Sequence, residues 1–454
     1  MDGEYDVIIC GSGLKECLLF GMLVANDKKV LLVDRNEHPG GESESLGLEA
    51  LWQKFRPGEE LPEGYGTDRD WFVDLIPKFV VACGKTVKVL LHTRVTRFLE
   101  WKSVDGTLVY QFQQGGFMSK AKMFHTVPET SAAVLKSPLM GLLEKSRAKN
   151  FYQFATNWDP TKQETWQGLD PWKNSMTQVF EKFGLQPNTV DFIGHAVAMY
   201  PTDEFLNEPY GEAMDRIKSY LHSASVYETS PLIYPIYGLS AVYEGFSRLA
   251  AECEATWLTG QAFDGFVYDA NGKVTGVASG KSIAKCKMVI CDPSYTDPDK
   301  PKITSVGKVI RAICILGAPI PDTGGASSCQ IIFTGKQLNR KNDVYLAMVS
   351  WGHCIACKDK YVATISTVAE TDNPVAELQP ALEVLGPIEH QYMTLSDIFV
   401  PLDDGTHDNV YVTSSYDSTC HFESISDDVL GIWSRMMGSE LDLTITANPE
   451  ELQE

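Results

Sequence analysis

The stretch YDVIICGSGLKECLLFGMLV, residues 5–24, joins a short apolar run to a glycine turn and then to a longer apolar segment. Residues 5–10 are rich in β-branched side chains, which is typical of a buried strand, and residues 14–24 have the length of a helix. A second apolar run at 30–33 ends at Asp34. The order strand, glycine turn, helix and strand predicts the βαβ unit of a dinucleotide-binding fold, in which Asp34 has the place of the ribose-binding carboxylate.

The glycine turn departs from the phosphate-binding pattern, which needs a third glycine so that the helix can approach the strand and the phosphates. Glu16 stands at that position. A late strand at 410–413 is followed by Ser414-Ser415-Tyr416-Asp417, where flavoproteins of this kind tend to carry a Gly-Asp element. We therefore expect the fold without its cofactor. A flavin-dependent enzyme of the amine oxidase type is the alternative from another functional class.

Composition limits the function further. The chain has 454 residues, 44% of them hydrophobic, which indicates a folded protein of two or three domains. Its formal net charge of −21 argues against nucleic acid and against a permanent place on an anionic membrane. Eleven scattered cysteines, no leader-like N-terminal segment and no apolar run of membrane-spanning length predict a cytoplasmic protein.

The pattern along the chain predicts an α/β fold made of an FAD-binding-like βαβ and mixed-sheet domain with an inserted helical domain. Further strands are expected at 87–91, 95–101, 108–113, 266–269, 273–277 and 288–290, with Asp105-Gly106 as a hairpin turn. Helices are expected at 137–152, 172–183, 189–200 and 210–227. The predicted division is a discontinuous sheet domain over 1–125 and 229–445, a helical domain over 126–228, and an acidic tail over 446–454.

Several blocks in the same order make the resemblance to a family specific. The opening block of residues 5–17 is followed by blocks at 34–36, 40–43, 69–71, 74–79, 194–196, 234–239, 290–295 and 435–440. Together they resemble the Rab GDP-dissociation inhibitors and Rab escort proteins, in which a glutamate after the shortened glycine motif is usual. The length, without a large insertion, is similar to the inhibitor branch.

This resemblance implies a binding protein and not an enzyme. A family member binds prenylated Rab GTPases in their GDP form, slows GDP release, and carries them between membrane and cytosol with transient membrane contact. An escort protein, which presents Rabs for geranylgeranylation, is the alternative within the family. A monomer without cofactor or metal is expected.

The resemblance also assigns residues to the GTPase-binding platform and to a mobile loop. The platform positions are Pro39, Glu42, Ser43, Arg69, Ala241, Arg248, Thr256 and Leu258, and the loop positions are Val226 and Tyr227. Five positions depart from the family's usual residues: Pro39 replaces a tyrosine, Asp68 an arginine, Ala241 a glutamate, Leu258 a methionine and Val226 an arginine. These changes predict a weaker platform or a diverged set of partners.

The helical segment is expected to shelter the geranylgeranyl lipid. The expected lining residues are Leu139, Met140, Leu143, Ile193, Ala196, Val197, Ile217, Tyr220 and Leu221, with Leu142 beside them and Gly194 leaving room for an isoprenoid. An ordinary helical core explains the same apolar spacing equally well.

Two other features are interpreted as structural. Cys354 and Cys357 have the spacing of a redox or metal pair, but predicted strands on both sides favour a chance occurrence. His195 lies on an apolar helix without an obvious carboxylate partner, which favours a packing role over catalysis.

Overall fold

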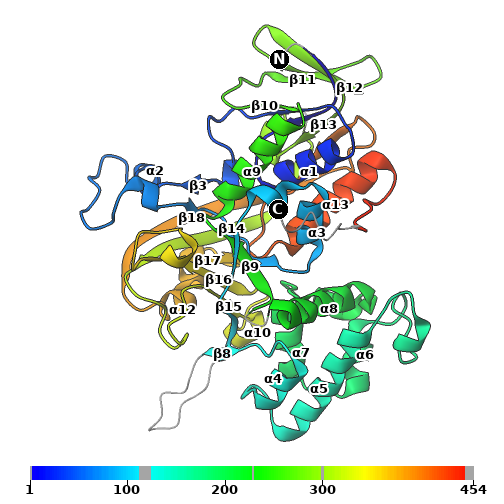
Figure 1. Cartoon of the computed structure of the whole chain (residues 1–454), viewed down its shortest axis with the longest axis vertical. Coiled ribbons are helices and arrows are strands. Elements are labelled where there is room, and N and C mark those ends of the chain that lie inside the picture. Colours follow the sequence, from blue (N-terminus) through cyan, green and yellow to red (C-terminus); the bar gives the residue numbers. More distant parts are fainter. Residues whose placement is uncertain (1–2, 112–123, 228–229, 298–300, 445–454) are drawn as a thin grey trace.

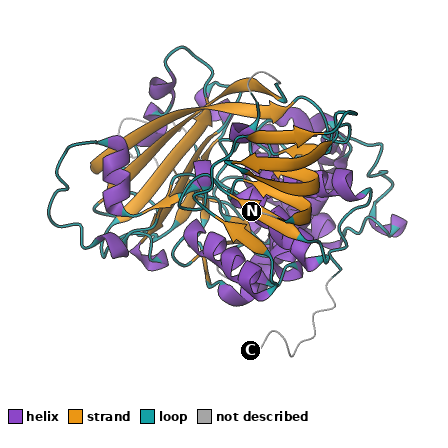
Figure 2. Ribbon diagram, turned by 90° about the horizontal axis from the view of Figure 1, so that it is seen from above, coloured by secondary structure: helices purple, strands orange, loops and turns teal. Residues whose placement is uncertain are grey.

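The computed structural model describes residues 3–111, 124–227, 230–297 and 301–444 (Figure 1). The described chain forms two seven-stranded sheets, two smaller sheets and a separate group of helices. Figure 2 shows the two large sheets beside each other, with helices packed around them. The mixed α/β fold class is confirmed.

The first large sheet contains the βαβ unit that opens the chain. Its strands, in spatial order, are β10 (Thr256–Leu258), β2 (Val30–Val33), β1 (Glu4–Cys10), β13 (Ser282–Cys291), β12 (Val274–Ser279) and β11 (Gly265–Tyr268), and β19 (Val410–Val412) pairs with the far end of β13. Helices α1 (Leu14–Ala25), α3 (Lys85–His92), α9 (Leu239–Glu252) and α13 (Glu423–Met437) pack together beside it. Val7 and Ile9 lie in the core that contains α1, whereas Ile8 lies in the core on the opposite face. Burial on both faces explains why residues 7–10 of β1 form an unbroken apolar run.

The second large sheet is antiparallel except where β15 meets β7. Its order is β18 (Ile388–Pro401), β14 (Ile303–Leu316), β17 (Tyr361–Val368), β16 (Val344–Ser350), β15 (Cys329–Phe333), β7 (Thr107–Tyr110) and β8 (Phe124–Thr126). One small sheet has the order β5 (Val80–Val81), β9 (Leu232–Pro235) and β6 (Trp101–Ser103). The other pairs β3 (Ser45–Leu46) with β4 (Val73–Asp74). The short helices here are α2 (Leu48–Phe55), α10 (Gly335–Leu338), α11 (Pro374–Glu377) and α12 (Gln379–Leu382). Cys354 and Cys357 lie in the connection from β16 to β17.

The remaining helices gather at the lower end of the long axis in Figure 1. They are α4 (Ser131–Lys136), α5 (Leu142–Asn157), α6 (Met176–Phe183), α7 (Pro187–Phe192) and α8 (Tyr210–Tyr227), and a π-helical turn, Ile193–Val197, continues α7. The predicted helix over 210–227 matches α8. The predicted helix over 137–152 begins later, because Pro138 and Gly141 precede α5.

Two predicted strands and one predicted hairpin are wrong. Residues 87–91 belong to α3, where Thr86, Val89 and Leu90 are buried at the i, i+3, i+4 spacing of a helix. Residues 95–98 form a 3₁₀ turn, and β6 begins only at Trp101. Asp105-Gly106 joins two different sheets, because β6 pairs with β9 while β7 pairs with β15 and β8. Residues 112–113 and the tail 446–454 lie outside the described residues.

Candidate functional site

A cavity of about 540 Å³ brings together residues that the sequence assigns to the binding platform. Pro39 and Arg69 line it, with Asp68 beside Arg69. Its other walls are His38, Ser45, Gly47, Trp71, Phe72 and, from α9, Ser240, Tyr243 and Glu244. Two loops separated by about thirty residues therefore meet the first turns of α9 at one concave surface.

Asp74 holds the parts of this platform together. Its buried carboxylate accepts hydrogen bonds from the backbone N–H of Leu239 at 3.1 Å and from the hydroxyls of Ser45 and Tyr234. A carboxylate at the start of α9 also complements the helix dipole. Burial raises the pKa of Asp74 to about 6. Gly238, at φ +67°, is required here because a Cβ atom would lie 2.4 Å from the Asp74 carboxylate.

Ser43 is a buried link and not an exposed contact. Its hydroxyl lies 2.8 Å from the Tyr243 hydroxyl and donates to the carbonyl oxygen of Gly40 at 3.0 Å. Tyr243 in turn donates to the carbonyl oxygen of Ser43 at 2.7 Å. Ser43 therefore ties the loop after β2 to α9.

The outer face of α9 carries the charged residues of the platform. Ala241, Glu244 and Arg248 follow i, i+3, i+7 spacing, so they share one face. Glu244 and Arg248 form an ion pair at 3.6 Å, and each side chain is 63% exposed. Sequence reasoning missed Glu244, which lies one turn after Ala241 and lines the cavity itself. The i, i+4 spacing of Glu244 and Arg248 in the sequence could have indicated that both side chains lie on one face of the helix.

Asp68 has a structural role that explains part of its departure from the family pattern. Its carboxylate accepts a hydrogen bond from the backbone N–H of Glu49, at 2.8 Å, in the first turn of α2. A Cβ atom at Gly47 would lie 2.6 Å from the same carboxylate. The side chain thus caps α2 across a gap of 19 residues, a position in which an arginine could not accept the bond.

The other assigned platform positions lie outside this cavity. Thr256 and Leu258 are half-buried on β10, the edge strand of the first sheet. Glu42 lines a different cavity, together with Gly40 and Gly41 of the same loop. Val226 and Tyr227 end α8 and are exposed.

The expected lipid-binding residues fall into two groups. Met140, Ile193, Ala196, Val197, Ile217, Tyr220 and Leu221 are buried in one continuous core, and Leu139 packs against it. Leu143 instead points to solvent, as does Leu142. The room expected at Gly194 is filled, because a Cβ atom there would lie 2.5 Å from the ring of Phe205. In this structure the predicted lining residues pack against one another, and Phe205 fills the space that was expected beside Gly194.

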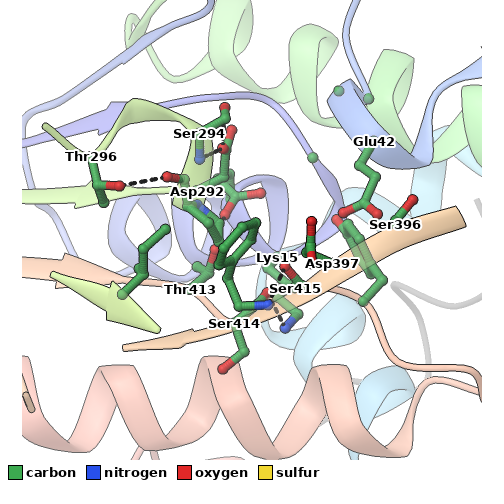
Figure 3. A pocket seen from close by; sticks show the side chains of 18 of the residues that line it. Lys15, Glu42, Asp292, Ser294, Thr296, Ser396, Asp397, Thr413, Ser414 and Ser415 are labelled. Atoms are coloured by element: carbon green, nitrogen blue, oxygen red, sulfur yellow. Dashed lines mark hydrogen bonds between the residues drawn. The ribbon is translucent and has the colours of Figure 1, made fainter. Parts of the chain in front are cut away.

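The second cavity, of about 660 Å³, lies where a dinucleotide cofactor would bind on this fold (Figure 3). Glu42, Asp292 and Asp397 surround it. The two cations that line it are engaged: Lys15 contacts Asp428 at 2.7 Å, and Arg35 donates to the carbonyl oxygen of Ser294 at 3.2 Å. The surroundings therefore favour positive charge over a pyrophosphate.

The residues of this cavity do not fit a flavin dinucleotide. The buried Glu16 accepts a hydrogen bond from Thr413 at 2.7 Å, and burial, reinforced by the charge of Asp292, raises its pKa to about 7. The N–H of Leu14, which opens α1 toward the phosphate position, already donates to the Tyr416 hydroxyl at 2.9 Å. The buried Asp34 carboxylate accepts hydrogen bonds from the hydroxyl of Tyr295, at 3.1 Å, and from the hydroxyl of Ser12. These bonds use the oxygens that would otherwise bind a ribose.

His195 has carboxylate partners that were not expected from the sequence. Its Nδ1 lies 2.7 Å from Asp343 and its Nε2 lies 3.3 Å from Asp203 and 3.9 Å from Asp191. Burial lowers the pKa of His195, but the hydrogen bonds to Asp203 and Asp343 outweigh burial and raise it to about 10. Lys336 lies 3.2 Å from Asp191 and 3.1 Å from Asp203, where a metal ion would have to bind. The cluster joins the π-helical turn to the second sheet.

A model of the family described as "GDP dissociation inhibitor" matches residues 1–448. The chain belongs to the GDP dissociation inhibitor family. A rat protein named Rab GDP dissociation inhibitor beta is 45% identical over 443 residues, which are 97% of each chain. A solved Rab GDI from Plasmodium falciparum has a TM-score of 0.93 and 47% identity, covering 97% of this chain and all of the other. The resemblance inferred from the sequence blocks is thereby confirmed.

A more distant likeness concerns the fold alone. An oxidoreductase from Methanosarcina mazei has a TM-score of 0.57 at 13% identity, over 95% of this chain and all of the other. This chain and the oxidoreductase share the overall fold. Within the described residues, no helix is long and apolar enough to cross a membrane.

Proposed function

We propose that this protein binds Rab GTPases in their GDP form and slows GDP release. The observation that carries the proposal is the match to Rab GDIs, which runs over 97% or more of both chains without a large insertion. This also favours the inhibitor over the escort function. The platform cavity supports the proposal, since it is concave, mixed in charge and built on a rigid helix.

The platform's electrostatics centre on Glu244 and Arg248. The family's usual glutamate is absent at Ala241, and Glu244 offers a carboxylate one helical turn away on the same face. We infer that Glu244 takes over the pairing with a basic residue of the GTPase, while Arg248 and Arg69 face acidic or carbonyl groups. Pro39 supplies an apolar contact in place of a tyrosine. This arrangement restricts the Rab partners to GTPases whose surface carries the complementary charges and an apolar contact for Pro39.

The prenyl chain needs apolar shelter of its own. Two twenty-carbon chains prefer a membrane by well over about 10 kcal/mol, so a carrier must bury comparable apolar area. We infer that the lipid enters among Met140, Ile193, Val197, Ile217 and Leu221, with Leu139, Ala196 and Tyr220 beside it. Because these residues pack against one another, the lipid can enter only if α5 moves away from α8.

The proposed activity is regulatory and not catalytic, and it needs no cofactor. The carboxylates of the dinucleotide cavity and the use of the Leu14 N–H by Tyr416 support this part of the proposal. The division into a sheet domain over 1–125 and 229–445 and a helical domain over 126–228 separates the GTPase platform from the lipid shelter. A monomer that works in the cytoplasm and visits membranes transiently meets these requirements.

Capture by the immobilised chain tests the proposal. Geranylgeranylated Rab loaded with GDP is expected to bind tightest, the same Rab loaded with a GTP analogue much more weakly, and unprenylated GDP-Rab in between or more weakly still. Equal capture of the GDP and GTP forms would contradict the nucleotide selectivity. A prenylated Rab that binds no better than an unprenylated one would contradict the lipid-carrier part alone.

A further inference from the structure

Three exposed leucines gather around the junction of α4 and α5. Leu135, the next-to-last residue of α4, is 47% exposed, and Leu142 and Leu143 begin α5 at 89% and 68% exposure. Their neighbours Met140 and Leu139 turn into the core. Adjacent exposed leucines cost free energy in water unless a partner covers them, so such a patch indicates an interaction surface.

The charge around these leucines is opposite to that of the whole chain. Residues 131–150 contain Lys136, Lys145, Arg147 and Lys149 but a single acid, Glu144, which gives +3 in a chain of −21. Glu144 is buried and accepts a hydrogen bond from the backbone N–H of Gln186 at 2.8 Å. Its other carboxylate oxygen lies 3.8 Å from Arg147, so Glu144 offsets that arginine and not the three lysines.

The lysines are available for a partner. Arg147 is held by the carbonyl oxygen of Gly184 at 3.0 Å, but across the described ranges Lys136, Lys145 and Lys149 form no ion pair. Leu142, Lys145 and Lys149 follow i, i+3, i+7 spacing on α5, where Leu142 is exposed and the two lysines beside it are half-buried. Apolar and basic side chains therefore lie together along one side of α5.

The position of this face suits contact with a flat surface. Helices α4 and α5 lie at the lower end of the long axis, at the opposite end from β11 and β12 of the first sheet (Figure 1). Contact made through this end keeps the platform beside α9 away from the contacted surface.

We propose that this α4–α5 tip, formed by Leu135, Lys136, Leu142, Lys145 and Lys149 with Leu143, docks reversibly on anionic lipid bilayers. The leucines enter the headgroup region while the lysine ammonium groups contact lipid phosphates and carboxylates. The chain's overall negative charge opposes prolonged residence, so docking is brief. The inference rests on the proposed function, in which the protein collects lipid-bearing partners from membranes, and it names the surface that makes the approach.

Co-sedimentation with vesicles tests the tip. The full chain is mixed with vesicles of phosphatidylcholine and phosphatidylserine that carry no GTPase and no prenyl lipid. The wild-type chain is expected to bind these vesicles at low salt, to release as salt rises, and to ignore vesicles of phosphatidylcholine alone. Lys145→Glu/Lys149→Glu and, separately, Leu142→Ser/Leu143→Ser are each expected to lower binding by about tenfold or more.

Matched controls separate the tip from general charge and apolarity. Lys281→Glu/Lys285→Glu makes the same charge change on exposed residues of the first sheet, and Leu402→Ser removes another exposed leucine. Both are expected to bind vesicles nearly as the wild type does. Equal losses in the tip and control variants would overturn the proposal, as would no binding by the wild type.

A last comparison distinguishes the bilayer from the lipid chain itself. If Leu142→Ser/Leu143→Ser keeps vesicle binding but loses capture of a geranylgeranylated peptide in solution, the leucines guide lipid entry and the docking proposal is wrong. Capture of GDP-Rab by the same variants, measured separately, shows whether the proposed function stands when the docking surface does not.

Discussion

Arg248→Ala should weaken binding of GDP-Rab while leaving the fold intact. Arg248 is 63% exposed and pairs only with Glu244, at 3.6 Å within the described residues. An exposed i, i+4 pair contributes about 0.3–0.5 kcal/mol, so the loss should lower the melting temperature by less than about 2 °C. A charged side chain buried at an interface is worth more: we expect about tenfold weaker binding, or about 1.4 kcal/mol.

The assay is a fluorescence titration of prenylated GDP-Rab, with Arg97→Ala as the matched control. Arg97 is also a half-exposed arginine paired with a glutamate of α9, but its partner Glu252 does not line the platform cavity, whereas Glu244, the partner of Arg248, does. The control should bind like the wild type. Unchanged affinity in Arg248→Ala, or a melting temperature lowered by many degrees, would refute the assignment of this residue to the interface.

Three further predictions concern the scaffold. Asp68→Ala removes the bond to the first turn of α2 and should cost about 1 kcal/mol in thermal unfolding; an unchanged melting temperature would show that the bond contributes nothing. His195→Gln should destabilise the protein by at most about 5 kcal/mol, because the folded pKa is raised from 6.5 to about 10. That loss should be complete below pH 6.5 and fade as pH rises through 10, so a gap between wild-type and variant denaturation curves that stays constant over this range would contradict the ion cluster. Glu16→Gly should bind no flavin tightly, since Tyr416 still occupies the N–H at the start of α1; a stoichiometric visible flavin spectrum would disprove this explanation.

Local patterns were enough to predict the parts of the fold that depend on sequence neighbours. The βαβ unit follows from β1, the glycine turn and α1, and α8 follows from its apolar spacing. Helix α3 was missed because its short β-branched sequence favours a strand, and burial of Val89 and Leu90 among neighbouring helices decides otherwise. The family resemblance came from ordered blocks and did not depend on these local assignments.

The candidate site was only partly predictable, because several of its bonds join distant residues. Asp68 caps a helix 19 residues earlier, and Tyr416 reaches the start of α1 across 402 residues. Neither contact leaves a spacing pattern in the sequence. The partners of His195 show both cases, since Asp191 precedes it by one helical turn whereas Asp343 lies immediately before β16, 148 residues later. The first could have been predicted, and the second required the fold.

GDP release from a prenylated Rab tests the central claim most directly. The Rab is loaded with a fluorescent GDP analogue, unlabelled GDP is added in excess, and the loss of fluorescence is followed with and without this protein. We expect release to slow by about tenfold or more at saturating protein, which corresponds to about 1.4 kcal/mol of preference for the GDP-bound state. Release at an unchanged or faster rate, under conditions in which the two proteins demonstrably bind, would contradict the proposal that the chain is a GDP dissociation inhibitor.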